Sequence, residues 1–345
     1  MDQRMLGDSG ITVSSICMGT MTFGTQCDEA VSDAIIDRAI EAGIDFFDAA
    51  EIYPVPPKKE YAGRTEEILG RKLKALGRDR FVVATKIAGP AHGWFVPPVR
   101  HGKAAIDARQ IKLAVEGSLQ RLQTDYIDLY QIHWPDHLIR PETPLRALED
   151  LMQAGKIRAI GCSNETTWGL MKSLQASERY GLPRFVSVQN NFSLINRRCE
   201  SELAQALRNE RVSLLPYSPL GGGVLTGKYN DQLPSGGRFT DYLVNGAARQ
   251  QAMAKRFVNE RTIETTRRLQ AIAQDCGVSV TALSVAWSRQ HDFVASTIIG
   301  ATSVKQLEES LDACDLILDS ETMRRIDEVE QEIPVPMTED GLRRL

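Results

Sequence analysis

The sequence lacks the residue clusters that mark disulfide-rich and metal-binding proteins. Its six cysteines are scattered and contain no CxxC pair. The five histidines do not have the spacing of a zinc site, and Pro135 between His133 and His137 argues against a shared helical face. We therefore expect buried, reduced thiols and no bound metal ion.

Long apolar runs are also absent. No stretch approaches the ~20 residues of a membrane-spanning helix, and the first ten residues lack the apolar centre of a signal peptide. The formal net charge of −4 gives no electrostatic reason to expect nucleic acid or an anionic membrane as a partner. A soluble cytoplasmic protein is the expectation, and its oligomeric state is left undetermined.

Short apolar segments alternate with amphipathic helical segments along most of the chain. The expected strands are nearly continuously apolar and rich in Val and Ile, which is typical of parallel strands buried on both faces. They cover residues 16–19, 44–48, 81–85, 127–132, 157–161, 185–189, 212–216 and 296–299. The expected helices cover residues 29–42, 65–76, 109–122, 144–154, 166–180, 198–209, 262–277, 279–290 and 304–313.

Eight strands, each followed by helical sequence, predict a single closed (β/α)8 TIM barrel of the α/β class. The alternative is an open doubly wound sheet, which normally carries GxGxxG after its first strand. The segment 19–24, GTMTFG, does not match that motif.

We expect one domain over residues 1–345, with a β-hairpin at about 3–15, the barrel at about 16–314, and an extra helix and tail at about 319–345. The tail could cross the barrel mouth. Two long loops, 88–107 and 218–258, should overhang the end of the barrel where the strands end.

Four polar residues follow successive expected strands. Asp48 and Tyr53 follow the second, Lys86 the third and His133 the fourth. Each alone has an ordinary structural explanation, such as a turn cap or a satisfied core imidazole. Because the carboxyl ends of barrel strands meet at one face, we expect the four side chains to converge there.

Their chemistry suits protonation of a carbonyl oxygen. A buried Lys86 needs a counter-charge, and Asp48 can supply it. A nearby cation can lower the pKa of Tyr53 by ~1–3 units, which would make the phenol a usable general acid. A neutral His133 can donate a hydrogen bond to a carbonyl as hydride reaches its carbon.

A separate pattern suggests a phosphate site after the seventh and eighth strands. Gly221-Gly222-Gly223 and the pair Gly227-Lys228 would let backbone N–H groups and one cation approach a phosphate. The segment GGVLTGK mimics a P-loop, but Tyr229 replaces the Ser or Thr that would bind Mg²⁺, which disfavours an ATPase. The segment 300–303 leads into the last barrel helix, whose N-terminus can also hold a phosphate.

In this order the motifs resemble the aldo-keto reductase family over nearly the whole chain. They are Asp48 with Tyr53, Lys86 in ATK, His133 in QIHWPD, GCSN at 161–164, Gln189, YSPLGGG at 217–223 and IIGATS at 298–303. The loop EIYPVPP and the insert near 88–108 are most similar to the bacterial branch that resembles the potassium-channel β subunits. The resemblance implies a barrel that binds NADPH without a Rossmann motif. It also implies that Tyr53 is the acid, that Lys86 and Asp48 tune it, and that His133 orients the carbonyl.

The resemblance also implies a set of cofactor contacts. Lys228 and Arg238 would cover the pyrophosphate, and Tyr217 would stack on the nicotinamide. Ser163, Asn164 and Gln189 would bond the nicotinamide carboxamide. Thr302, Ser303 and Gln306 would contact the adenosine phosphate, with Glu309 near the adenine. Thr20, Met21 and Gln26 would flank the cofactor from the first loop. Further expected cofactor residues are Asp48, Ser218, Pro219, Leu220, Gly221, Gly223, Gly300 and Ser310. Many relatives have Asn where Ser310 stands and a stronger cation nearer Thr302, so NADPH is expected over NADH with Lys305 as the nearby cation.

Alternative functions remain open. The resemblance permits a redox-sensing NADP(H)-binding partner protein, against which the intact His133 argues. A generic barrel isomerase or lyase would bind no nicotinamide, and reduction of a C=C bond would imply an acidic residue in place of His133. The substrate is expected to be a small carbonyl compound, and Trp94, Phe95, Trp134 and Tyr61 suggest an aromatic-lined pocket.

Overall fold

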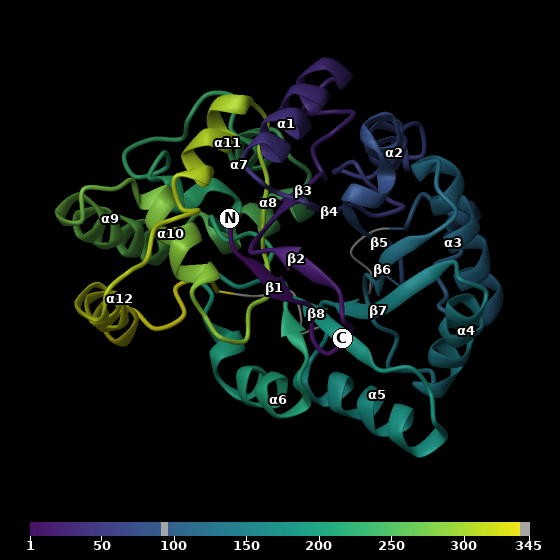
Figure 1. Cartoon of the computed structure of the whole chain (residues 1–345). Helices are drawn as coiled ribbons and strands as arrows, with labels where there is room; N and C mark the ends of the chain where they lie inside the picture. The colour runs from purple at the N-terminus through teal and green to yellow at the C-terminus, as the bar shows by residue number, and fades with distance from the viewer. Residues whose placement is uncertain (91–95, 339–345) are drawn as a thin grey trace.

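The structure is a computed structural model that describes residues 1–90 and 96–338 (Figure 1). Its centre is an eight-stranded, all-parallel sheet in the order β10-β3-β4-β5-β6-β7-β8-β9. The strands are β3 Ile16–Gly19, β4 Phe46–Asp48, β5 Val82–Ile87, β6 Ile127–Ile132, β7 Ile157–Ser163, β8 Phe185–Gln189, β9 Ser213–Leu214 and β10 Thr297–Ile299.

Parallel bridges between Leu214 and Val294 and between Tyr217 and Ile298 link the β9 side of the sheet to the β10 side. The sheet therefore curls round on itself, and the predicted (β/α)8 barrel is confirmed. The prediction that the strands are buried on both faces is also confirmed for β3, β4, β6 and β8, because every residue of these strands is buried.

Helices surround the barrel, as Figure 1 shows for α1 to α6 and α9 to α11. The α-helices are α1 Glu29–Glu41, α2 Arg64–Leu76, α3 Ala108–Leu122, α4 Glu142–Gln153, α5 Thr167–Tyr180, α6 Glu202–Glu210, α7 Arg238–Val244, α8 Ala248–Phe257, α9 Glu260–Asp275, α10 Val280–Arg289, α11 Val304–Leu311 and α12 Ser320–Glu332. Short 3₁₀ turns are η1 Arg78–Arg80, η2 Arg100–Gly102, η3 Arg198–Glu200 and η4 Gly221–Thr226.

Polar caps fix several helix starts. The side chains of Asp28, Asp107, Thr166 and Ser303 each accept a hydrogen bond from a backbone N–H in the first turn of α1, α3, α5 and α11. Such caps satisfy backbone donors that have no partner within the helix. The loops at the barrel face therefore enter their helices at defined residues.

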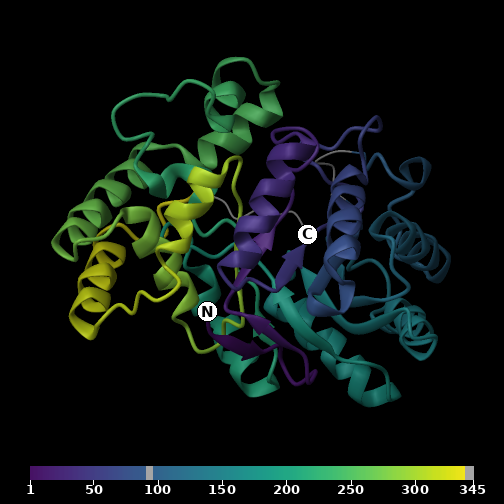
Figure 2. The same ribbon diagram turned by 45° about the horizontal axis from the view of Figure 1, so that its top comes forward.

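The N-terminal hairpin, β1 Gln3–Met5 and β2 Thr12–Ser14, is confirmed. Leu6, Ile11 and Val13 pack against barrel residues that include Cys17 and Phe46. In Figure 2 the hairpin lies at one end of the barrel and the segment with α7 and α8 at the other. The hairpin thus closes the end away from the strand termini that carry the polar residues.

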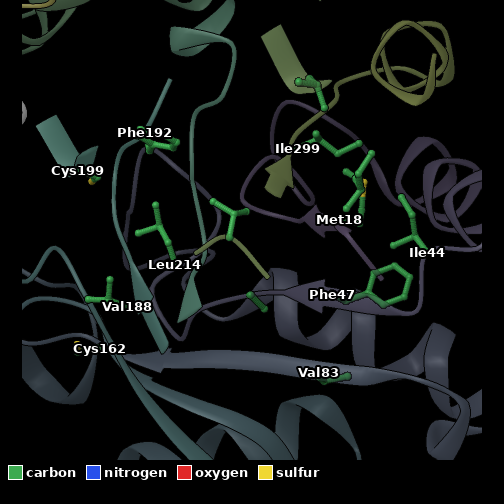
Figure 3. Packing of buried hydrophobic residues seen from close by; sticks show 14 of the residues in the cluster. Met18, Ile44, Phe47, Val83, Cys162, Val188, Phe192, Cys199, Leu214 and Ile299 are labelled. Atoms are coloured by element: carbon green, nitrogen blue, oxygen red, sulfur yellow. The ribbon is translucent and has the colours of Figure 1, made fainter. Parts of the chain in front are cut away.

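The main apolar cluster lies between the strands and the surrounding helices. Figure 3 shows Met18, Phe47, Val83, Val188 and Ile299 projecting from different strands into this packing. The expectation of buried thiols holds for Cys17, Cys27, Cys162 and Cys199 but was wrong for Cys276, which is exposed, and Cys314 is partly buried; no disulfide joins cysteines in the described ranges. Within the same ranges no helix has the length and apolar character needed to cross a membrane.

Two predictions about the elements were wrong. The segment 218–258 is not a plain loop, because it contains η4, α7 and α8; its many charged and glutamine residues obscured the helical pattern around buried Ala254 and Phe257. The expected helix 198–209 is broken at Ser201, whose ψ of −110° is not helical, so η3 and α6 are separate.

The C-terminal part begins as predicted, with α12 over Ser320–Glu332. Beyond it, the N–H of Met337 donates to the carbonyl of Ile195 at 3.0 Å, a normal backbone hydrogen-bond distance. Met337 is fully buried, and Arg198 donates to its carbonyl. The chain after α12 therefore returns to the loop that follows β8, while residues 339–345 of the predicted tail lie outside the described residues.

Candidate active site

Three neighbouring strands place the expected catalytic side chains. Asp48 is the last residue of β4, and His133 directly follows β6. Lys86 was predicted to follow its strand, which was wrong. It lies inside β5, one residue before the end of the strand and opposite Gln131 of β6. The structure brings Asp48, Tyr53, Lys86 and His133 together, although Asp48 and His133 are 85 positions apart in the chain.

Asp48 and Lys86 form a buried ion pair. Lys86 Nζ lies 2.5 Å from Asp48 Oδ1 and donates a second hydrogen bond of 2.7 Å to the carbonyl of Ala49. Lys86 is fully buried and Asp48 is 2% exposed. Burial lowers the pKa of Lys86, but Asp48 and Tyr53 outweigh it, so the net pKa is raised and the ammonium stays charged.

The other carboxylate oxygen of Asp48 is also satisfied. Asp48 Oδ2 accepts hydrogen bonds from Gln131 Nε2 at 3.1 Å and from Gln189 Nε2 at 2.8 Å. Four side chains from β4, β5, β6 and β8 thus share one buried polar network. Such a network holds its members rigidly, because any unpaired buried polar group is costly.

Tyr53 lies beside this pair. Lys86 Nζ is 4.9 Å from the centroid of the Tyr53 ring. The expectation that the cation lowers the pKa of Tyr53 was wrong in its net direction: burial raises it more than Lys86 lowers it, and Asp48 raises it further. The sequence located the cation but did not reveal how deeply the phenol is buried, at 9% exposure. The phenol is therefore protonated at neutral pH and able to donate.

His133 completes the group. Its ring centroid is 5.7 Å from that of Tyr53 in an edge-on arrangement, and it stacks on Trp134 at 3.9 Å. Burial and then Lys86 hold the pKa of His133 well below its usual range, so the imidazole is neutral. Its buried Nδ1 has no hydrogen-bond partner among the described residues.

The residues expected at the nicotinamide form a connected set at the ends of β7, β8 and β9. Ser163 Oγ donates to the Gln189 carbonyl at 2.8 Å, and Tyr217 Oη donates to Asn164 Oδ1 at 2.7 Å. Asn164 Nδ2 donates to the His133 carbonyl at 2.9 Å. This set is therefore coupled to His133 through hydrogen bonds.

The first loop packs against the turn that carries Tyr53. Thr20 donates to the Asp48 carbonyl, the N–H of Val55 donates to the Met21 carbonyl, and Gln26 Nε2 donates to the Val55 carbonyl. Thr20 is buried, Met21 half-buried and Gln26 exposed. These residues hold the first loop against the Tyr53 turn, and their contact with a cofactor stays a prediction.

The glycine-rich turn after β9 is built for close approach. Gly221, Gly222 and Gly223 all have positive φ, and a Cβ on Gly223 would lie 2.9 Å from Lys228 Nζ. Ser218 also has a positive φ, and Pro219 and Leu220 complete the turn. The φ of +96° at Gly223 strains any residue with a side chain, which favours glycine there, and a Cβ would also push the flexible Lys228 head group aside.

Two cations face this turn. A Cβ on Gly222 would lie 3.0 Å from Arg238 Nη2, so the guanidinium lies over the turn. Neither Lys228 nor Arg238 forms an ion pair within the described ranges. Burial lowers the pKa of Arg238, and burial together with the charge of Arg238 lowers the pKa of Lys228. Two adjacent cations with no carboxylate bound to them are suited to an anionic ligand.

The second expected phosphate site lies at the start of α11. Gly300 precedes it, Ser303 caps it, and Thr302 bonds Gln306 Oε1 through both its N–H and its hydroxyl at 2.9 Å. Gln306 and Glu309 are exposed, whereas Ser310 is buried on the inner face with its hydroxyl directed to the Gln306 carbonyl. Ser310 is thus the expected cofactor residue that the helix turns away from the surface.

Three residues that the sequence did not single out belong to the site. Gln131 binds Asp48, and its position opposite Lys86 on the next strand could have revealed it. Glu51 and Arg100 form a buried ion pair beside Tyr53, and no local pattern indicated that Glu51 points inward.

Trp94 and Phe95, expected in a substrate pocket, lie outside the described residues. Trp134 packs near Tyr53, and no cluster of three possible metal ligands occurs in the described ranges.

The fold and the site define a (β/α)8 barrel with a lysine–carboxylate pair, a tyrosine and a neutral imidazole at the carboxyl ends of its strands. The Aldo/keto reductase family matches residues 15–331, and the chain belongs to this family.

Named relatives match at full length. The chain is 37% identical to "Protein tas" of Escherichia coli K12 over 97% of this chain and 99% of that protein. It is 32% identical to a "Probable voltage-gated potassium channel subunit beta" of rice (Oryza sativa), over 97% and 98%. It is 30% identical to "Uncharacterized oxidoreductase YrpG" of Bacillus subtilis, over 95% and 96%. The predicted family and branch are thereby confirmed, and the family makes the chain an oxidoreductase.

Proposed function

We propose that the protein reduces an aldehyde or ketone to an alcohol with NADPH as the hydride donor. The observation that carries the proposal is the position of Lys86, which contacts Asp48 Oδ1 at 2.5 Å and lies 4.9 Å from the Tyr53 ring. Family membership and a relative named "Versiconal hemiacetal acetate reductase", 29% identical over 95% of this chain, support carbonyl chemistry.

In this proposal Tyr53 is the general acid. Its phenol is protonated at neutral pH and donates its proton to the carbonyl oxygen as the carbonyl carbon is reduced. Lys86 then stabilises the phenolate that forms, because an ammonium beside the ring lowers the energy of the charged state. Asp48 keeps Lys86 charged and in place, so it acts on the acid through the lysine.

His133 orients the substrate in the same proposal. Because its pKa is well below neutrality, the imidazole is uncharged and can donate a single N–H to the carbonyl oxygen without competing as an acid. Its link through Asn164 to Tyr217 fixes the backbone that carries it. Two donors would therefore meet one oxygen, which polarises the carbonyl.

A nicotinamide nucleotide fits the remaining residues and would supply the hydride when bound. Lys228 and Arg238 over the glycine turn would hold the pyrophosphate, and the N-terminus of α11 with Thr302 and Ser303 would hold the adenosine phosphate. Ser163, Asn164, Gln189 and Tyr217 would hold the nicotinamide end. A second phosphate site favours NADPH over NADH.

A redox-sensing partner protein is the second candidate, because relatives named potassium-channel subunits beta match over nearly the whole chain. The intact His133 favours the enzyme. A small-molecule site, reduced buried thiols and a cytoplasmic location fit both candidates.

The test is NADPH oxidation, followed at 340 nm, with a panel of small aldehydes and ketones such as 4-nitrobenzaldehyde. The enzyme should consume NADPH with at least one carbonyl, and NADH less efficiently. Tight NADPH binding without consumption for any of them would favour the sensor, and a lack of NADPH binding would contradict both.

A further inference from the structure

Glu51 links the two strand ends that carry Tyr53 and Lys86. Its backbone N–H donates to the Lys86 carbonyl at 3.2 Å, and its Oε1 accepts from the N–H of Ala88 at 2.6 Å. One residue therefore binds the backbone on both sides of Ile87. Glu51 is 2% exposed, so water does not compete for these bonds.

Arg100 holds this carboxylate in place. Its Nη1 binds Glu51 Oε1, its Nη2 donates to the Ala88 carbonyl at 2.9 Å, and its Nε donates to Gln110 Oε1 at 3.1 Å. Arg100 and His101 both have positive φ, which is unfavourable for residues with a side chain. The local backbone adopts this conformation while the guanidinium satisfies three acceptors.

Tyr53 lies on the turn that Glu51 begins. The N–H of Tyr53 donates to the Ala50 carbonyl at 3.0 Å, which closes the turn around Glu51 and Ile52. Ala50, Ile52, Tyr53 and Ala88 pack into one small apolar cluster. The separation between the Tyr53 ring and Lys86 Nζ thus depends on how this turn is fixed to the end of β5.

Resting on the proposed function, we propose that Glu51, held by Arg100, is a positioning residue that sets the Lys86–Tyr53 geometry. Glu51 does not reach the reacting atoms itself. The Ala88 N–H and Arg100 Nη1 both bind the same oxygen, Oε1, so glutamine at position 51 would keep that acceptor but lose the negative charge that strengthens the bond to the guanidinium. The turn would then shift relative to β5.

A matched control exists in the same molecule. Glu66 is fully buried, is bound by Arg121 Nε at 2.6 Å and accepts a hydrogen bond of 2.5 Å from Thr85 of β5. It resembles Glu51 in burial and pairing but lies on α2, outside the Tyr53 turn. Glu66→Gln therefore reports what the loss of a buried carboxylate alone does.

The experiment compares Glu51→Gln, Arg100→Met, the double variant and Glu66→Gln, with NADPH and 4-nitrobenzaldehyde. We expect Glu51→Gln to lower kcat about tenfold to hundredfold, since small misplacements of catalytic groups have effects of this size. The Kd for NADPH, from tryptophan fluorescence, should change less than about twofold. The double variant should be no slower than the worse single variant, because the pair acts as one unit. Glu66→Gln should lower Tm by a similar amount but retain kcat.

A second measurement does not depend on turnover. With 3-fluorotyrosine incorporated, the ¹⁹F resonance of Tyr53 is identified by its loss in Tyr53→Phe. Glu51→Gln should shift this resonance and Glu66→Gln should not. An unshifted resonance, or equal kcat losses in the two glutamate variants at equal Tm, would overturn the positioning role. A wild-type protein that oxidises no NADPH would instead contradict the proposed function, and the resonance would still decide the role of Glu51.

Discussion

Lys86 Nζ lies 2.5 Å from Asp48 Oδ1, and both side chains are buried at the ends of adjacent strands. The pair contributes to the stability of the fold and to the proposed catalytic group. Asp48 is bound by Gln131 and Gln189 as well, and Lys86 contacts Tyr53, so a change to either member affects both stability and the proposed acid.

Tyr53→Phe should lower the rate of aldehyde reduction by about 10²–10⁴-fold, because it removes the proton donor and little else. The Kd for NADPH should remain close to that of the wild type, since the hydroxyl is not expected to touch the nucleotide. Steady-state rates and fluorescence titration measure the two quantities. A variant with the wild-type rate would show that another group is the acid.

Lys86→Met should destabilise the fold by about 3–5 kcal/mol, because Asp48 would remain as a buried, unpaired charge. Adding Asp48→Asn should recover part of this loss, since the double variant buries no net charge. Free energies of unfolding from urea titration measure both. As a control, Arg38→Met breaks a pair with Glu308 in which both side chains are about a third or more exposed, and it should cost no more than about 1 kcal/mol.

Lys228→Met and Arg238→Met should each weaken NADPH binding about tenfold to hundredfold, as expected for the loss of one hydrogen bond to a charged group. The value of kcat at saturating NADPH should change little, because neither cation is near Tyr53 in the proposed arrangement. Lys172→Met, at an exposed position of α5, is the control and should bind NADPH normally. Unchanged affinity in both glycine-turn variants would argue against the phosphate site there.

The half-buried His291 should make the protein less stable in mild acid. Burial, followed by the charge of Arg197, lowers the pKa of His291 to about 4. The unfolded chain then binds the proton near pH 6.5 whereas the folded chain does not, so stability falls as the pH drops below 6.5. Between pH 7 and pH 5 the expected loss from this residue is about 2 kcal/mol.

Urea titration of the wild type and His291→Gln at both pH values measures this loss as the difference between their pH dependences.

His137 gives a comparison of opposite sign. Its hydrogen bond to Glu165 raises its pKa, so its contribution is fully present below pH 6.5 and is lost as the pH rises through the folded-state pKa. His137→Gln should therefore cost more stability at pH 5 than at pH 8.

The sequence by itself determined the barrel and the order of its parts. Buried parallel strands must be apolar on both faces, so Ile16–Gly19, Ile127–Ile132 and Phe185–Gln189 could be located to the residue. Polar residues at the carboxyl ends of such strands also had to share one face, which placed Asp48 and His133 at that face.

Only the tertiary structure decided which residues of the site contact one another and in which direction their pKa values shift. Whether the pKa of Tyr53 rises or falls depends on the balance between burial and the charge of Lys86, and burial is set by chain segments distant in sequence. The inward positions of Glu51 and Arg100 likewise follow from packing between loops, for which no short sequence pattern exists. Local periodicity specifies elements, whereas the electrostatics of the site come from contacts that form only when the barrel closes.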